Sequence, residues 1–213
     1  MAALNGGSLA VYVVTSNGLA PGRGHRDVAV AAIEGGATAL QLRAPELSDE
    51  QLRPLASDLA ERCREVGVLF VVNDRVDVAA QSGAGVHVGQ GDDPSEARLR
   101  IGSEAVVGIS VSSPGQAVEA ARAGADYLGV TVWATATKPE ATPAGLEGLR
   151  AVVEATSLPV VAIGGIDADN ASEALEAGAV GVAVVSAVGA APDPVAATRR
   201  LVDAVRAAEV GRR

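Results

Sequence analysis

The chain has 213 residues, a length that suits one domain with a large core, and we expect a single domain over residues 1–213. Hydrophobic residues make up 48% of the sequence but aromatic residues only 2%, so Val, Ile, Leu and Ala must fill the interior, as is typical of sheets covered by helices. The formal charge of −9, from 26 acidic and 17 basic residues, argues against nucleic acid or an anionic membrane surface as a partner.

The apolar runs are shorter than the roughly 18 to 20 residues of a membrane-spanning helix. The opening MAALNGGSLA also lacks a cationic region followed by an apolar segment, so we predict a cytoplasmic protein. Its one cysteine, Cys63, cannot form an internal disulfide, and we expect it to be buried or half-buried in a helix. Residues 1–8 and 208–213 are expected to fray, and the sequence does not indicate an oligomeric state.

Short β-branched apolar runs alternate with longer segments of helical period along the chain. The eight predicted strands are residues 9–15, 38–43, 69–73, 86–89, 105–110, 127–132, 159–164 and 180–185. Strict alternation implies parallel strands with right-handed crossovers, so we predict an α/β fold, a single (β/α)8 TIM barrel with short loops. An open doubly wound sheet is the alternative, but no G-x-G-x-x-G opens the first helix.

In such a barrel the loops after the carboxyl ends of the strands carry the chemistry. The period of two places Gln41 and Arg43 on one face of the second strand, opposite Leu40 and Leu42. Polar groups on the inner face are costly unless they meet partners there, so we predict that this pair binds a ligand. A structural ion pair at the barrel mouth is the alternative.

Carboxylates follow the third and fourth strands. Asn73 and Asp74 come directly after an apolar run, and Asp92 and Asp93 lie on the loop after the fourth strand. Loops of adjacent strands lie close together, and two or three oxygen ligands completed by water or phosphate suit Mg²⁺. The sequence therefore predicts a metal site, with helix capping as the alternative for each aspartate.

The remaining strand ends carry hydroxyl groups, one lysine and glycines whose backbone N–H groups can approach an anion. These residues are Ser110, Ser112, Thr135, Thr137, Lys138, Gly164, Gly165 and Ser186. A lysine before a proline is often only solvated, and a glycine pair can serve a tight turn alone. Neither His25 nor His87 has a partner spaced for zinc, and there is no cysteine nucleophile with a base or Ser-His-Asp set. The groups suit holding phosphates rather than nucleophilic attack.

Several long stretches carry a resemblance to a known family. In chain order they are GGATALQLR, VVNDRVDVAA, GAGVHVGQGD, GADYLGV, TATK, PVVAIGGIDADNASEALEAGAVGVAVVSAV and DP. With them the chain resembles the thiamine-phosphate synthase family from residue 12 to residue 194. The resemblance implies a (β/α)8 barrel that joins the pyrophosphate ester of 4-amino-5-hydroxymethyl-2-methylpyrimidine to a thiazole phosphate and releases pyrophosphate, with Mg²⁺ as cofactor.

The resemblance also implies a role for each polar residue. The expected contacts of the pyrimidine pyrophosphate are Gln41, Arg43, Asn73, Ser110 and Lys138. The expected contacts of the thiazole phosphate are Thr135, Thr137, Gly165 and the backbone of Val185 and Ser186. Asp74 and Asp92 are expected to hold Mg²⁺, and the expected catalytic groups are Arg43, Ser110 and Lys138.

Three departures from the family pattern concern rate rather than fold. Pro45 stands where the family has a lysine, so one cation near the pyrophosphate is missing. The segment GVTVWATATK is one residue shorter than the usual loop, with Trp133 near the aromatic position, so Thr135 is aligned only to within one residue. Ser112 stands where many relatives carry histidine.

Two alternatives remain open for the function. A thiazole tautomerase resembles the synthase on the same barrel, but it typically lacks the aspartates and uses a histidine at the position of Ser112. A non-catalytic thiamine-precursor or phosphate-binding barrel would bind ligand without forming product. In each case the expected partners are small molecules.

Overall fold

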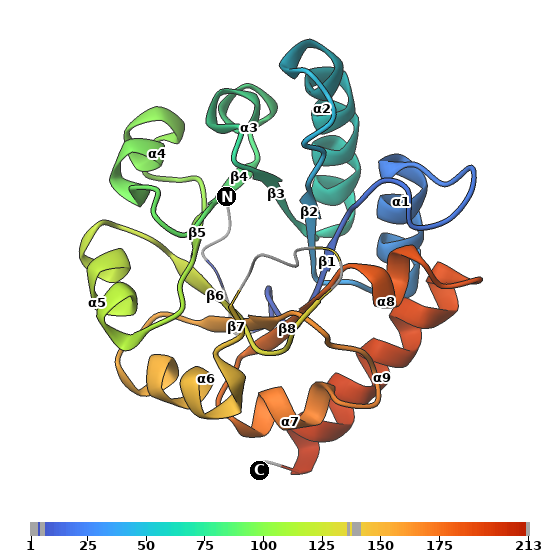
Figure 1. Cartoon of the computed structure of the whole chain (residues 1–213). Helices are drawn as coiled ribbons and strands as arrows, with labels where there is room; N and C mark the ends of the chain where they lie inside the picture. Colours follow the sequence, from blue (N-terminus) through green and yellow to red (C-terminus); the bar gives the residue numbers. More distant parts are fainter. Residues whose placement is uncertain (1–3, 5–6, 136, 138–141, 212–213) are drawn as a thin grey trace.

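Eight parallel strands close into a barrel in chain order, with β1 paired to both β2 and β8, in the computed structural model of the chain (Figure 1). The structure describes residues 4, 7–135, 137 and 142–211. The strands are β1 (Val11–Val14), β2 (Ala39–Leu42), β3 (Leu69–Asn73), β4 (Gly85–Val88), β5 (Val107–Ser110), β6 (Tyr127–Thr131), β7 (Val160–Ile163) and β8 (Gly181–Val184). The predicted barrel is therefore confirmed, and the open-sheet alternative is wrong.

Helices surround the barrel on its outer face (Figure 1). They are α1 (His25–Gly35), α2 (Asp49–Val66), α3 (Val76–Ser82), α4 (Pro94–Ile101), α5 (Pro114–Arg122), α6 (Gly145–Glu154), α7 (Ala171–Glu176), α8 (Ser186–Gly189) and α9 (Pro194–Gly211). Ser48 and Ser113 cap α2 and α5 through their side chains. Helix α9 includes residues 208–211, which belong to the segment that the sequence predicts to fray.

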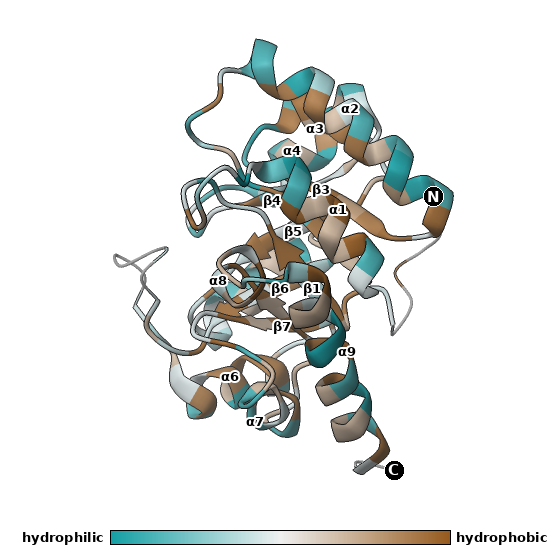
Figure 2. Cartoon of the chain, turned by 90° about the vertical axis from the view of Figure 1, so that its right-hand side faces the viewer, coloured by the Kyte–Doolittle hydropathy of each residue, from teal (hydrophilic) through white to brown (hydrophobic). Residues whose placement is uncertain are grey.

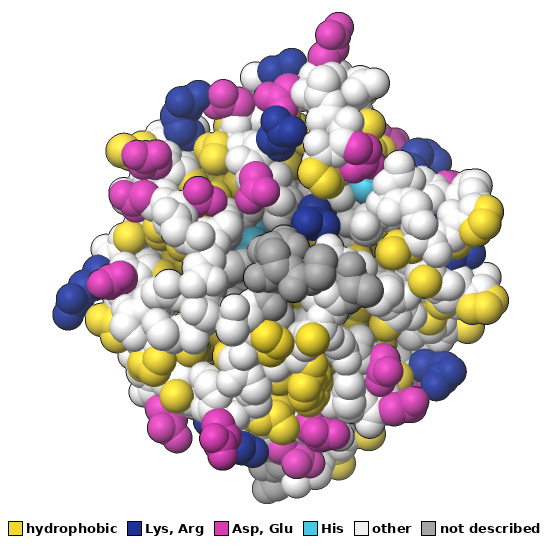
Figure 3. Space-filling model, in the orientation of Figure 1, with side chains coloured by type: hydrophobic (Ala, Val, Ile, Leu, Met, Phe, Trp, Pro, Cys, Tyr) yellow, Lys and Arg dark blue, Asp and Glu magenta, His cyan; other side chains and the backbone are white. Residues whose placement is uncertain are grey.

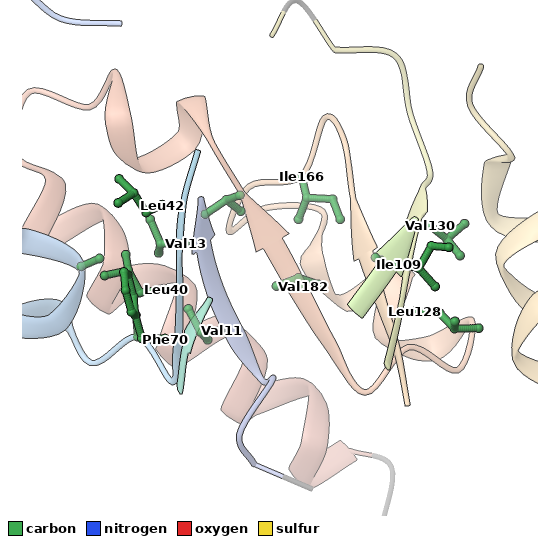
Figure 4. Close-up of a cluster of buried hydrophobic side chains, with 14 of the residues drawn as sticks. Val11, Val13, Leu40, Leu42, Phe70, Ile109, Leu128, Val130, Ile166 and Val182 are labelled. Carbon is green, nitrogen blue, oxygen red and sulfur yellow. The ribbon is translucent and has the colours of Figure 1, made fainter. Parts of the chain in front are cut away.

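Successive side chains along each strand alternate between two apolar environments, one outside the barrel and one inside it. Side chains such as Leu40, Leu42 and Val13 point outward and pack with the helices in the larger hydrophobic cluster (Figure 4). Tyr12, Tyr127 and other inward-facing residues form a second cluster inside the barrel. Figure 2 shows the corresponding pattern, with hydrophobic strands at the centre and hydrophilic residues on the outer helices. The period of two thus places Gln41 on the inner face, opposite Leu40 and Leu42, as predicted.

Glycines inside the barrel allow close packing, Gly108 against the Tyr127 ring and Gly181 against the backbone of Leu9. A Cβ added at Gly108 would lie 2.1 Å from Cζ of Tyr127, and one at Gly181 would lie 1.9 Å from the carbonyl oxygen of Leu9. Large and small residues therefore alternate between neighbouring strands, so that the interior is filled without a wide channel. The tyrosine rings are held at fixed positions below the barrel mouth.

Cys63 is fully buried on α2, which confirms the prediction for this residue. Burial raises the pKa of its thiol to about 12, so it stays protonated and unreactive. Among the described helices, none is both long enough and apolar enough to span a membrane.

Candidate active site

A pocket opens at the carboxyl ends of the strands, and residues from all eight strands line it. We call it the mouth pocket. Nine of the ten residues that are expected to contact substrate line it, namely Gln41, Arg43, Asn73, Ser110, Thr135, Thr137, Gly165, Val185 and Ser186. The tenth, Lys138, lies outside the described residues. Strand ends that are far apart in the sequence thus converge on one cavity.

Arg43 follows β2 directly and is half-buried at the pocket wall. Within the described part of the chain no carboxylate forms an ion pair with its guanidinium, so the structural ion pair considered from the sequence is not seen there. Arg43 is held instead through its backbone, because its N–H donates to Oγ1 of the buried Thr15 at 3.2 Å. Its cationic head remains available to a ligand in the pocket.

The same threonine is part of a clamp on the loop that follows β2. His25 Nδ1 lies 2.9 Å from Thr15 Oγ1, and its Nε2 lies 2.7 Å from Glu46 Oε1. Partial burial acts to raise the pKa of Glu46, but hydrogen bonds to His25, to the backbone and to Asn17, together with the charge of His25, outweigh it, so the pKa is lowered. Sequence reasoning assigned His25 no role, because nothing in the spacing indicates that it meets Thr15 and Glu46.

A row of hydrogen bonds crosses the barrel interior at the floor of the mouth pocket, and all of its members line that pocket. Gln41 Nε2 donates to the Tyr12 hydroxyl at 2.9 Å, and the hydroxyls of Tyr12 and Tyr127 lie 2.9 Å apart. His87 Nδ1 lies 2.9 Å from the Tyr127 hydroxyl, and its Nε2 lies 3.0 Å from Ser110 Oγ. Sequence reasoning missed Tyr12, Tyr127 and His87. The sequence did contain a signal for these three residues, because each lies at an inward-facing position of its strand and polar rings are rare in this chain.

Burial keeps both tyrosines protonated. It raises the pKa of Tyr12 to about 12 and that of Tyr127 well above its ordinary value. Tyr12 and Tyr127 are 2% and 0% exposed, so neither hydroxyl can exchange its protein partner for bulk water. The row therefore acts as a fixed set of neutral hydrogen-bonding groups.

Asp74 and Asp92 line a second pocket, on the outer side of β3 and β4, which we call the acidic pocket. Neither lines the mouth pocket itself. The link is Asn73, which lines the mouth pocket while its Nδ2 donates to Asp74 Oδ2 at 2.6 Å. Figure 3 shows acidic and basic side chains gathered over α2, α3 and α4, around this region.

The loops hold these aspartates in different ways. Asp74 has a φ of 61°, a left-handed conformation that is uncommon for residues other than glycine and is often found at functional sites. Asp92 Oδ2 accepts the backbone N–H of Gly89 at 2.7 Å. Asp93 instead caps α4 by accepting the N–H of Ser95 at 2.8 Å. The capping alternative thus holds for Asp93, whereas neither Asp74 nor Asp92 is the N-cap of the helix that follows it.

The donor set fits a magnesium ion with few protein ligands. Ion pairs with Arg75 and Arg100 engage Asp49 and Asp77, two other acids of the acidic pocket. No group of three His, Cys, Asp or Glu side chains that could hold a metal occurs among the residues that the structure describes. Two carboxylates on adjacent loops suit Mg²⁺, which usually keeps several waters and takes its other ligands from substrate phosphates.

The opposite side of the mouth is built from close backbone packing. Gly164 and Gly165 have φ values of 91° and 65°. A Cβ added at Gly164 would lie 2.7 Å from the carbonyl oxygen of Trp133, and one added at Gly165 would lie 2.9 Å from the Cβ of Trp133. Asn170 Nδ2 donates to the carbonyl oxygen of Gly165 at 2.8 Å. The glycine pair therefore has a turn-forming role, and it also brings the loop after β6 against the loop after β7.

The two threonines of that loop lie together, with 3.0 Å between Thr135 Oγ1 and Thr137 Oγ1. Ser112 was also expected among the phosphate-holding groups at the strand ends, but it is exposed and does not line the mouth pocket. Its N–H and its hydroxyl both donate to Gln116 Oε1, at 2.8 and 3.2 Å. Ser112 thus contacts α5 from the loop that precedes it and does not line the mouth pocket.

Comparisons with known proteins agree with this geometry. The family model for thiamine monophosphate synthase matches residues 11–188. The thiamine-phosphate synthase of Chloroflexus aurantiacus is 50% identical over 194 residues, which are 90% of each chain. That of Natronomonas pharaonis is 50% identical over 201 residues, 92% of this chain and 94% of the relative.

Solved structures give the same result. A thiamine phosphate pyrophosphorylase from Pyrococcus furiosus superposes with a TM-score of 0.87 at 41% identity, over 95% of this chain and 98% of that one. A 3-hexulose-6-phosphate synthase, 20% identical with a TM-score of 0.69 over 92% of this chain and 99% of that one, shares the fold alone.

Proposed function

This chain belongs to the thiamine monophosphate synthase family, and we propose that its mouth pocket couples a pyrimidine pyrophosphate to a thiazole phosphate. Membership makes it a transferase of thiamine biosynthesis. In the proposed reaction the bond between the methylene carbon and the pyrophosphate oxygen breaks, and the thiazole nitrogen forms a bond to that carbon. The observation that carries the proposal is the convergence of nine expected contact residues on one pocket.

The side near β2 to β5 is suited to the pyrophosphate. Arg43 presents a guanidinium without a described carboxylate partner, and Ser110 presents a hydroxyl at the end of β5. Mg²⁺, held by Asp74 and Asp92, would neutralise the charge that grows on the leaving pyrophosphate. Arg43 and Ser110 stabilise the same charge through fixed donors, which lowers the barrier without reorganisation. Lys138 is proposed as a further cation.

The side near β6 to β8 is suited to the thiazole phosphate. Its glycines and hydroxyls, Gly165, Thr135, Thr137 and Ser186 among them, offer donors without net charge. A phosphate bound there would tether the thiazole beside the methylene carbon, and such proximity alone is worth a large rate factor. The aminopyrimidine ring can support positive charge on the methylene, so no protein nucleophile is required.

Apolar side chains give the pocket its dry walls. Val161, Ile163 and Ile166 line it together with the tyrosine rings, and they provide contact area for the two heterocycles. Exclusion of water also protects the cationic methylene from hydrolysis. The predicted cytoplasmic location remains part of this proposal.

The direct test is to incubate the purified protein with both substrates and Mg²⁺ and to measure thiamine phosphate and pyrophosphate. We expect both products in equal amounts and a loss of turnover when the metal is removed with a chelator. Saturable binding of both ligands without product would instead support the non-catalytic alternative. Turnover of a thiazole carboxylate phosphate without Mg²⁺ would support the tautomerase alternative.

A further inference from the structure

The row of hydrogen bonds at the floor of the mouth pocket connects two residues that lie on different strands. It begins at Gln41 on β2, passes through Tyr12, Tyr127 and His87, and ends at Ser110 on β5. Its three inner members are at most 9% exposed. The heavy-atom distances, between 2.9 and 3.0 Å, are those of well-formed hydrogen bonds.

The direction of each bond follows from the first one. The amide nitrogen of Gln41 can only donate, so the Tyr12 oxygen accepts. The hydroxyl proton of Tyr12 then goes to the Tyr127 oxygen, because a buried donor left without a partner is costly. By the same reasoning the proton of Tyr127 goes to Nδ1 of His87. A neutral histidine that accepts at Nδ1 carries its hydrogen on Nε2 and donates it to Ser110 Oγ.

The two ends of the row are left with opposite roles. No described residue donates to Oε1 of Gln41, which therefore faces the mouth pocket as an acceptor. The Ser110 oxygen already accepts from His87, so its own hydrogen is directed to a ligand in the pocket. An acceptor suits an exocyclic amine, and a hydroxyl donor suits an anionic phosphate oxygen.

We propose that Tyr12, Tyr127 and His87 are positioning residues, a one-way hydrogen-bond chain that fixes Gln41 as an acceptor and Ser110 as a donor toward the substrate. The assignment of the two ends to the amine and the pyrophosphate rests on the proposed function. In the reverse direction Ser110 would donate to His87 and turn its lone pairs toward the anion. The tautomer of His87 therefore decides whether this wall of the pocket attracts or repels a phosphate. Both tyrosines stay protonated, as the chain requires, because burial raises their pKa values.

The first test reads the tautomer in the free enzyme by ¹⁵N NMR. The chain has only two histidines, so the signals of His87 are those that disappear in His87→Gln. We expect an unprotonated Nδ1 and a protonated Nε2. The opposite tautomer would reverse the bonds from Tyr12 to Ser110, would require Gln41 to turn its Oε1 toward Tyr12, and would overturn the proposal. This readout requires no substrate, so it stands even if the enzyme forms no thiamine phosphate and the proposed function fails.

The second test breaks the row at different points. Tyr127→Phe keeps the ring that packs on Gly108 and removes the donor to Nδ1, so we expect a mixed tautomer and a loss in kcat/KM of roughly tenfold or more. In Tyr12→Phe, Tyr127 still donates to His87, so the tautomer should persist while KM for the pyrimidine pyrophosphate rises. Ser110→Ala should also retain the tautomer but lower kcat.

Thr198→Val is the matched control, because it removes a buried hydroxyl that donates to the carbonyl oxygen of Pro194 in α9, away from the pocket. It should change neither the tautomer nor kcat/KM. An unchanged tautomer in Tyr127→Phe would show that the row does not set the state of His87, and it would sink the proposal. Thermal unfolding of each variant identifies any loss that comes only from stability.

Discussion

The two sides of the barrel mouth present binding groups in different ways. The side near β2 to β4 uses charged side chains, namely Arg43 in the mouth pocket and the aspartates of the acidic pocket, which Asn73 links to it. The described binding groups of the side near β6 to β8 are glycines in left-handed conformations and uncharged hydroxyls. The first side depends on the charge of its residues, and the second depends on how closely the backbone packs. Loss of charge should therefore damage the first side, and an added methyl group should damage the second.

The largest effect is expected from loss of charge in the acidic pocket. Asp74→Asn and Asp92→Asn should each lower kcat at least about a hundredfold, because the carboxylates are proposed to hold Mg²⁺ at the leaving pyrophosphate. Excess Mg²⁺ should restore part of the activity, and a magnesium titration of kcat measures this. Both side chains are exposed, so the unfolding temperature should change little.

Asp93→Asn is the matched control for this prediction. It neutralises the next residue in the same pocket, and asparagine can keep the cap of α4. It should leave the magnesium dependence unchanged. Equal losses in all three variants would indicate a general effect of negative charge in this pocket and would contradict a two-aspartate site.

On the opposite side, Gly165→Ala should raise KM for the thiazole phosphate roughly tenfold while KM for the pyrimidine pyrophosphate changes little. The added methyl would lie 2.9 Å from Cβ of Trp133, so the loop after β6 must move. A φ of 65° costs alanine a further ~1 kcal/mol of stability. Initial rates with each substrate varied in turn separate the two KM values.

Gly67→Ala provides the comparison for the strain alone. Gly67 has a φ of 73°, a Cβ there would meet no atom within 4 Å, and it caps α2 away from the mouth pocket. Gly67→Ala should lose a similar ~1 kcal/mol of unfolding free energy without a change in either KM. If Gly67→Ala also raised KM for the thiazole phosphate, close packing of the mouth would not be the cause.

A smaller effect is expected at the clamp that holds the backbone of Arg43. Glu46→Gln removes the charge that meets His25, so we expect a loss in kcat/KM of a few fold and lower stability at neutral pH. The folded-state pKa of Glu46 lies below its unfolded value. Its contribution is therefore complete above the unfolded pKa of about 4.3 and is lost as the pH falls through the lower folded value.

Denaturant unfolding from pH 7 to pH 3 measures this contribution, and the difference between the original protein and Glu46→Gln should shrink at the acidic end. Asp58→Asn is the control, because Arg62 on α2 and Arg26 on α1 lower the pKa of Asp58 in a similar way. Asp58→Asn should show the same pH trend with unchanged kcat/KM. A loss of activity in both variants would mean that the clamp has no special connection to Arg43.

The strands and the strand-end residues of both sides could be predicted from the sequence, but the position of the aspartates could not. Strands and the facing of Gln41 followed from the period of two, because burial on one side forces that period. The polar residues after each strand were predicted to converge, and in a parallel barrel they must. The separation of the aspartates into their own pocket was not predicted, and for Asp74 it accompanies a left-handed backbone conformation that the apolar periodicity does not indicate.

Contacts between side chains that are distant in the sequence were the part that could not be predicted. Tyr12 and Tyr127 are separated by 115 positions in the sequence. Their hydroxyls meet only because the barrel interior is narrow. His25 likewise reaches Glu46 only after α1 and the loop following β2 are in place. Such partners are fixed by the closure of the barrel, which no local pattern encodes.

The smallest expected effect concerns the missing cation on the charged side. Pro45 is exposed on the loop after β2, two residues beyond Arg43, and it is where the family pattern has a lysine. Pro45→Lys should lower KM for the pyrimidine pyrophosphate a few fold, because an exposed cation near a phosphate contributes modestly and is screened by salt. The gain should therefore shrink as ionic strength rises. Pro45→Gln removes the ring without adding charge and should show no gain, whereas equal gains in both variants would mean that loop stiffness, not charge, limits this side of the mouth.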